Sequence, residues 1–187
     1  MYKSKKHKNN EIRGFTIVEL IVIIGIVGFI SATVITGGNK GLEQRKVILE
    51  SKHLVENIRK VQNMAMSSVS HECGVSPNPS NIKVASSGII LDTSLSDRYS
   101  LIVDCNENKI YDASDILLST VFLSGTRITI LSPVSPLTIF FIPPLPLTSV
   151  NTNTSTTAEI RVCGINDTTV CRYVYVNSRG SVTIQAH

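Results

Sequence analysis

The sequence contains no Trp and only five Phe and five Tyr among 187 residues, and 17% of its residues are charged. It has no HExxH motif, no glycine-rich phosphate loop and no Ser-His-Asp arrangement, which are signatures of common catalytic sites. Its four histidines stand apart, at His7, His53, His71 and His187. No CxxC pair or His-rich segment shows the spacing of a zinc site. We therefore expect no enzymatic activity and no zinc.

The net charge of +4 arises in residues 1–14, which hold five basic side chains and one acidic side chain. The rest of the chain carries equal numbers of both signs, and from His71 onward acidic residues outnumber basic ones. Such a balance gives no reason to expect nucleic acid as a partner. A basic stretch before an apolar segment instead keeps that end of the chain in the cytoplasm, by the positive-inside rule.

One apolar run, residues 15–35, spans 21 residues and contains a single charge, Glu19. As a helix it would be about 31 Å long, which matches the roughly 30 Å hydrocarbon core of a bilayer. We therefore predict a transmembrane helix over residues 15–35. A carboxylate in such a helix costs at least about 2.5 kcal/mol and marks function. One alternative is a plain single-pass membrane anchor. The other is a secretory signal peptide cut near Ala32, although this run is longer than the roughly 7–15 residues of a signal-peptide core.

The segment Gly14-Phe15-Thr16-Ile17-Val18-Glu19, after a Lys-rich leader, resembles the class III signal of type IV prepilins and type II secretion pseudopilins. The resemblance implies that residues 1–14 are a leader, that a prepilin peptidase cuts between Gly14 and Phe15, and that the Phe15 amine is methylated. It also implies that Glu19 meets the amino terminus of a neighbouring subunit during filament assembly. Cleavage creates a cation four residues before Glu19 on the same helical face, and such pairing makes a buried carboxylate tolerable.

The same resemblance implies partners and a location. The partners are other pilin or pseudopilin subunits, the prepilin peptidase and an assembly platform in the inner membrane. The chain is expected to cross that membrane once, with its leader in the cytoplasm and its head outside, and then to enter a periplasmic or cell-surface filament. The sequence leaves open whether the machine serves adhesion, motility, secretion or DNA uptake, and whether the subunit is major or minor.

Residues 36–70 are predicted to continue the helix as an amphipathic segment, after glycines that mark the exit from the bilayer. Apolar or small residues recur at alternating steps of four and three, which is the period of one helical face. They are Val47, Ser51, Leu54, Ile58, Val61 and Ala65. The charged residues between them are expected to form a solvated face: Glu43, Arg45, Lys46, Glu50, Lys52, Glu56, Arg59 and Lys60. A free coiled-coil stalk is the alternative, but fewer heptads are available than such stalks usually have.

Residues 71–187 contain short runs rich in Val, Ile, Tyr and Thr, separated by Gly, Pro, Asn and Ser, which predicts strands. The runs are residues 88–91, 99–103, 116–123, 128–131, 137–142, 160–163, 173–176 and 181–184. They do not alternate with helices, so we expect antiparallel sheet. Residues 143–159, which are rich in Pro, Ser and Thr, are predicted to be an exposed loop. The predicted fold class is α+β, with a long N-terminal helix packed on a C-terminal antiparallel β domain, which is the layout of the pilin family.

All four cysteines follow the apolar run and are expected to face an oxidising compartment, where disulfides persist. Four cysteines allow three connectivities. The turn-rich segment between Cys163 and Cys171 favours that pair, which leaves Cys73 and Cys105 for the second disulfide.

Residues 104–115 place oxygen-bearing side chains at the spacing of a twelve-residue EF-hand loop, and they are also similar to the dockerin form of that loop. The expected ligands of a structural calcium ion are Asp104, Asn106, Asn108, the main-chain carbonyl of Ile110, Asp112 and Asp115. Lys109 occupies the position where glycine usually makes the sharp turn. A polar turn that joins two strands without a metal is the alternative.

Residues 171–182 are similar to the last hairpin of H-class minor pseudopilins and T-type minor pilins, with Ser181 in place of a second arginine. The expected function is a non-catalytic subunit, a minor pilin or pseudopilin, of a type IV filament or type II secretion-like machine. The rival function is a minor pilin that captures DNA through Arg161, Arg172 and Arg179. Three arginines supply a small phosphate footprint, and they would have to lie side by side.

Overall fold

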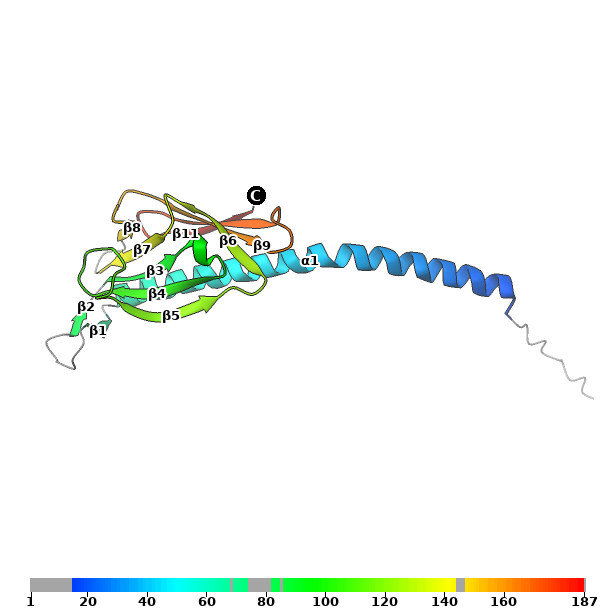
Figure 1. Ribbon diagram of the computed structural model, residues 1–187, viewed down its shortest axis with the longest axis horizontal. Coiled ribbons are helices and arrows are strands. Elements are labelled where there is room, and N and C mark those ends of the chain that lie inside the picture. The colour runs from blue at the N-terminus through cyan, green and yellow to red at the C-terminus, as the bar shows by residue number, and fades with distance from the viewer. Residues whose placement is uncertain (1–14, 68, 74–81, 85, 144–146, 187) are drawn as a thin grey trace, which may run out of the picture. The chain divides into compact units, whose positions relative to one another are not determined.

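The computed structural model describes residues 15–67, 69–73, 82–84, 86–143 and 147–186 (Figure 1). Within these ranges, the side chains of residues 34–39, 72, 82–84, 130 and 131 are not described. The predicted leader, residues 1–14 with Gly14 at its end, lies outside the described residues. The chain divides into two compact units, Met1–Asn39 and Lys40–His187.

The first unit contains the start of helix α1 (Ile17–Met66). Every side chain from Phe15 to Thr33 is exposed. Among the helical residues whose side chains are described, no stretch is long and apolar enough to cross a membrane. The span predicted for residues 15–35 ends in residues 34 and 35, whose side chains lie outside the described set, so the span stays a prediction.

The second unit combines the rest of α1 with strands β1 to β11 and the short 3-10 helix η2 (Thr93–Leu95). The strands are β1 (Ser70–Glu72), β2 (Ile82–Val84), β3 (Ser86–Leu91), β4 (Arg98–Asp104), β5 (Ile116–Phe122), β6 (Thr126–Ser132), β7 (Leu137–Ile142), β8 (Leu147–Val150), β9 (Ala158–Gly164), β10 (Cys171–Val176) and β11 (Val182–Ala186). A five-stranded sheet has the order β5-β4-β3-β7-β8, a four-stranded sheet has the order β11-β10-β9-β6, and β1 pairs with β2. All of these pairs are antiparallel, as predicted.

The predicted apolar stripe of α1 is the face that packs on the two larger sheets. All six of its residues are buried: Val47, Ser51, Leu54, Ile58, Val61 and Ala65. Leu54 and Ile58 belong to one core cluster with side chains from both sheets, and Figure 1 shows this part of α1 lying against their strands. Ser51 donates its hydroxyl to the Val47 carbonyl oxygen at 2.7 Å, so the one polar group of the stripe has a partner. The structure therefore confirms the α+β fold.

Each apolar run that predicted a strand lies in β3, β4, β5, β6, β7, β9, β10 or β11, except for Leu123 and Ser181 at the ends of two runs. Gly88 lies in β3 at the centre of the five-stranded sheet, opposite Phe140 of β7. A Cβ at this position would collide with the main-chain oxygen of Ile139 and the ring of Phe140. A glycine is therefore required for the close approach of these strands.

The exposed loop predicted for residues 143–159 is wrong in two places. β8 lies inside it and pairs with β7, and three of the four β8 residues are buried: Thr148, Ser149 and Val150. The last two residues of the predicted loop begin β9, where Ala158 is buried. The polar composition suggested a loop, but β-branched Thr and Val fit a strand once a partner strand is available. Residues 144–146 of this loop lie outside the described residues.

Both predicted disulfides are formed. Cys163 and Cys171 face each other across the β9–β10 pair and are bonded. Cys73 and Cys105 form the second bond, and both are buried in a small cluster with Val103. The first disulfide joins two paired strands, whereas the second joins the end of β1 to the end of β4, which belong to different sheets.

Candidate functional site

The first candidate site is the start of α1, where the sequence predicts processing at Phe15 and assembly through Glu19. The main-chain N–H of Thr16 donates to Glu19 Oε2 at 3.4 Å, and the N–H of Glu19 donates to Thr16 Oγ1 at 3.3 Å. This reciprocal pair is a capping box, which satisfies N–H groups that have no partner in a preceding turn. Glu19 therefore has a local role in the single chain, and the Thr-x-x-Glu pattern of the sequence is the signal that reveals it.

The groups that a neighbouring subunit would have to reach are accessible in this first turn. Phe15 is 72% exposed and Ile17 is 77% exposed. Glu19 is exposed as well, and its two contacts with Thr16 donors on its Oε2 are both long, at 3.4 Å. A carboxylate held this loosely remains able to accept a stronger donor.

The second candidate site is the loop between β4 and β5, where the sequence predicts calcium. Its side-chain oxygens accept hydrogen bonds from within the loop. Asn106 Oδ1 accepts from the N–H of Asn108 at 3.1 Å, and Asn108 Oδ1 accepts from the N–H of Ile110 at 2.7 Å. Asp112 Oδ2 accepts from the side-chain amides of Asn106 at 2.9 Å and Asn108 at 2.7 Å. The structure therefore gathers three of the predicted ligands.

The remaining two carboxylates lie where the loop begins and ends. Asp104 Oδ2 accepts from the N–H of Lys109 at 2.8 Å. Asp115 Oδ1 accepts from the N–H of Cys105 at 3.0 Å, and its Oδ2 accepts from the N–H of Asp112 at 2.9 Å. Lys109 has φ 62°, so a lysine makes the sharp turn at the position where glycine was expected.

The carboxylates of this loop have different environments. Hydrogen bonds from Ser114, and then from Asn106 and Asn108, hold the pKa of Asp112 below its ordinary value. Burial raises the pKa of Asp115, and the negative charges of Asp104 and Asp112 add to that increase. No three His, Cys, Asp or Glu side chains in the described residues converge closely enough to hold a metal, so calcium stays a prediction.

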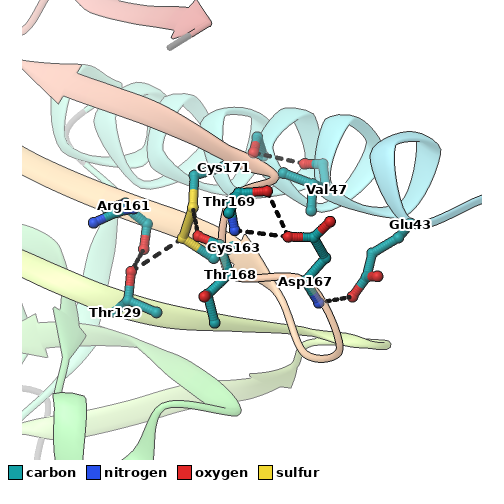
Figure 2. Close-up of a disulfide and its surroundings, with 10 residues drawn as sticks. Glu43, Val47, Thr129, Arg161, Cys163, Asp167, Thr168, Thr169 and Cys171 are labelled. Atoms are coloured by element: carbon teal, nitrogen blue, oxygen red, sulfur yellow. Dashed lines mark hydrogen bonds between the residues drawn. A yellow bond between two sulfur atoms is a disulfide. The ribbon is translucent and has the colours of Figure 1, made fainter. Parts of the chain in front are cut away.

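Figure 2 shows a contact that the sequence did not predict, between α1 and the loop closed by the Cys163–Cys171 disulfide. Glu43 was expected on the solvated face of the helix, but it is only 8% exposed. Its Oε1 accepts from the main-chain N–H groups of Asn166 at 2.7 Å and Asp167 at 3.1 Å. Glu43 lies four residues before Val47, so the helical period places it on the face of the apolar stripe, and only its charge suggested exposure. The period contains no information about the loop that folds over this end of the stripe.

The three arginines of the predicted DNA contact do not share one face of the four-stranded sheet. Arg161 of β9 lies directly opposite Tyr173 of β10, and its guanidinium lies over the Tyr173 ring, 5.6 Å from the centroid. Arg172 directly precedes Tyr173, and side chains alternate along a strand, so Arg172 points to the other face. It lines a hollow against α1 there. Arg179 lies in the turn between β10 and β11.

The structure thus groups Asn106 and Asn108 around Asp112, forms both predicted disulfides, and places Arg161 and Arg172 on opposite faces of their sheet. No protein-family model, curated protein or solved structure matches the chain.

Proposed function

We propose that this chain is a non-catalytic subunit, a minor pilin or pseudopilin, of a type IV filament or type II secretion-like machine. The observation that carries the proposal is the exposed apolar segment from Phe15 to Thr33, in which Glu19 is the one charge. Such a surface needs an apolar environment. Lipid supplies it before assembly, and the helices of neighbouring subunits supply it in the filament. The prepilin peptidase cuts after Gly14, and the chain waits in the inner membrane with its head outside.

The two disulfides support a head outside the cytoplasm. Cys73–Cys105 and Cys163–Cys171 lie in the second unit, after the apolar segment. Disulfides persist in oxidising compartments and are rare in the cytosol. The basic residues before the apolar segment keep the opposite end in the cytoplasm. Both features support a single crossing of the membrane, with the basic end in the cytoplasm and the head outside it.

The role proposed for Glu19 is an exchange of partners. In the single chain its carboxylate has long contacts with Thr16 donors at 3.4 Å. A methylated Phe15 amine from a neighbouring subunit would carry a positive charge. Charge-assisted hydrogen bonds are about 2.7–2.9 Å long and roughly twice as strong as neutral ones. In an apolar helical bundle this pairing would set the register between subunits.

A plain membrane anchor is the second candidate, and the capping box favours it. Thr16 gives Glu19 a capping role that requires no neighbouring subunit, because the pair satisfies the first N–H groups of α1. This candidate predicts no cleavage after Gly14 and no effect of the Glu19 charge on assembly. Both differences are measurable.

The first experiment is mass spectrometry of the N-terminal peptide from native membranes of cells that contain an active prepilin peptidase. The expected peptide begins at methylated Phe15. A peptide that retains Met1 would contradict the filament proposal and support the plain anchor. A peptide that begins at Thr33 would instead indicate a secreted β domain.

The second experiment separates the charge of Glu19 from its capping role. Glu19→Gln keeps an oxygen that accepts from Thr16 but removes the charge, whereas Glu19→Ala removes both. We expect both variants to insert normally into membranes and to enter sheared filaments at least tenfold less than the wild-type chain. Glu56→Ala removes an exposed carboxylate of α1 in the second unit and is the matched control. Normal incorporation of Glu19→Gln would contradict the pairing.

A further inference from the structure

The carboxylate of Asp104, the last residue of β4, is buried and only partly satisfied in the described structure. Asp104 is 0% exposed. Its Oδ2 accepts from the N–H of Lys109, which directs the carboxylate into the loop, but its Oδ1 accepts no hydrogen bond among the described residues. The ion pairs found in the described structure do not include it. A buried carboxylate oxygen is costly without a donor or a cation, so the Oδ1 of Asp104, which no described residue contacts through a hydrogen bond, favours a bound cation.

The loop that Asp104 faces is lined by side chains whose oxygen atoms can act as metal ligands. Asn106 and Asn108 contact Asp112 through hydrogen bonds at 2.9 Å and 2.7 Å. Asp115 returns to the start of the loop, because its Oδ1 accepts from the N–H of the residue directly after Asp104. The only cysteine of the loop is bonded to Cys73, and the loop contains no histidine, so it offers no nitrogen or sulfur ligand of the usual kind.

We propose that this loop binds one calcium ion, with the buried Oδ1 of Asp104 as its first ligand. The other ligands are side-chain oxygens of Asn106, Asn108, Asp112 and Asp115 and the carbonyl oxygen of Ile110. Calcium takes six to eight oxygen ligands in flexible geometry, whereas magnesium demands a near-ideal octahedron and keeps several waters. A loop that offers six protein oxygens, two of them from asparagine side chains, therefore fits calcium better than magnesium.

Binding has to rearrange the loop side chains, because no three acidic, His or Cys side chains of the described residues already converge on one point. Asp112 now accepts from the amides of Asn106 and Asn108. The ion replaces these bonds and turns the amide oxygens of both asparagines inward. A site that must reorganise binds weakly, so we expect a dissociation constant of about 10⁻⁴–10⁻³ M, the range of extracellular modules. The role is structural, because the loop joins β4 to β5 beside the Cys73–Cys105 bond.

The test uses the full chain in detergent after treatment with a chelator. Tyr111 lies inside the loop and the chain has no Trp, so Tb³⁺ luminescence excited through tyrosine reports an ion bound close to a tyrosine, and the loop variants below show whether that ion lies in this loop. Calcium is then titrated against bound Tb³⁺, with magnesium in a parallel titration. The melting temperature is measured with and without calcium. At ten to a hundred times its dissociation constant, calcium should raise the melting temperature by roughly 3–10 °C.

Three variants make the test specific to the loop. Asp104→Asn keeps an oxygen for the Lys109 N–H but removes the charge, and Asp112→Asn removes the charge of an exposed carboxylate in the same loop. Both should weaken calcium binding at least tenfold. Asp97→Asn changes an exposed aspartate outside the loop and should bind as the wild-type chain does.

Two results would overturn the proposal. One is the absence of saturable calcium binding up to about ten times the upper expected constant. The other is binding that survives unchanged in both Asp104→Asn and Asp112→Asn, which would mean that the ion sits elsewhere. In either case residues 104–115 form a polar turn only.

Discussion

Removing the carboxylate of Glu43 should loosen the loop between β9 and β10. Its Oε1 accepts from two main-chain N–H groups, those of Asn166 and Asp167, at 2.7 Å and 3.1 Å. Gly164 makes room for this contact, since a Cβ there would collide with the Glu43 side chain. The prediction concerns Glu43→Ala, with Glu43→Gln as the conservative variant.

The magnitude follows from the two donors. A buried donor left without its partner costs about 1–3 kcal/mol, and water can reach part of this loop, so we expect about 3 kcal/mol in total for Glu43→Ala. For a unit of this size, each kcal/mol shifts the melting temperature by about 2–4 °C. Glu43→Ala should therefore melt about 6–12 °C below the wild-type chain. Glu43→Gln keeps an acceptor oxygen but loses the charge, so its loss should be roughly half as large.

The assay is thermal unfolding, monitored through the near-UV circular dichroism of the tyrosines, with both disulfides intact. Glu56→Ala, an exposed carboxylate on the same helix, controls for the loss of a surface charge. Amide hydrogen exchange should accelerate at Asn166 and Asp167 in Glu43→Ala and not in the control. Gly164→Ala should also destabilise the chain, and by much less in the Glu43→Ala background, because the two positions share one contact. Equal melting of Glu43→Ala and Glu56→Ala would refute this account of the loop.

Two further predictions concern the sheets and the disulfides. Gly88→Ala should destabilise the second unit by about 3 kcal/mol or more, because its Cβ meets the main chain of β7, whereas Gly41→Ala, on α1 with open space around it, should be neutral or slightly stabilising. Denaturant unfolding would show the difference, and an unchanged midpoint for Gly88→Ala would contradict it. Replacing Cys73 and Cys105 by Ser should cost about 1 kcal/mol more than replacing Cys163 and Cys171, because they close a separation of 32 residues rather than 8. The opposite order in the same assay would count against loop-closure entropy as the cause.

The sequence predicted the parts of the fold that depend on local periodicity. The stripe from Val47 to Ala65 could be predicted because residues three or four positions apart lie on the same face of a helix. All six residues of the stripe are buried. The apolar runs identified eight of the strands, because short runs of β-branched and aromatic residues between turn residues are typical of strands. β8 was missed because its burial comes from pairing with β7 and not from its own composition, which is mostly polar or β-branched.

The candidate sites also contain some features that are local in the sequence and others that depend on tertiary contacts. The Thr16–Glu19 pair and the spacing of residues 104–115 are local patterns, so the order of the amino acids is enough to reveal both. The burial of Asp104 is different, because it depends on the neighbours of β4 in the five-stranded sheet. The separation of Arg161 from Arg172 required the register of β9 against β10, which a composition count does not contain.

The sequence by itself therefore determined the class of the fold, the helical face that is buried, the pairing favoured for the cysteines and the resemblance at residues 14–19. Each of these rests on residues close together in the chain or on a strict period. Only the tertiary structure decided that Glu43 is buried under a loop more than a hundred residues away, that one Asp104 oxygen has no partner among the described residues, and that residues 147–150 form a strand. The physical reason is that burial and hydrogen bonding depend on which segments meet, and long-range contacts of that kind leave no period in the sequence.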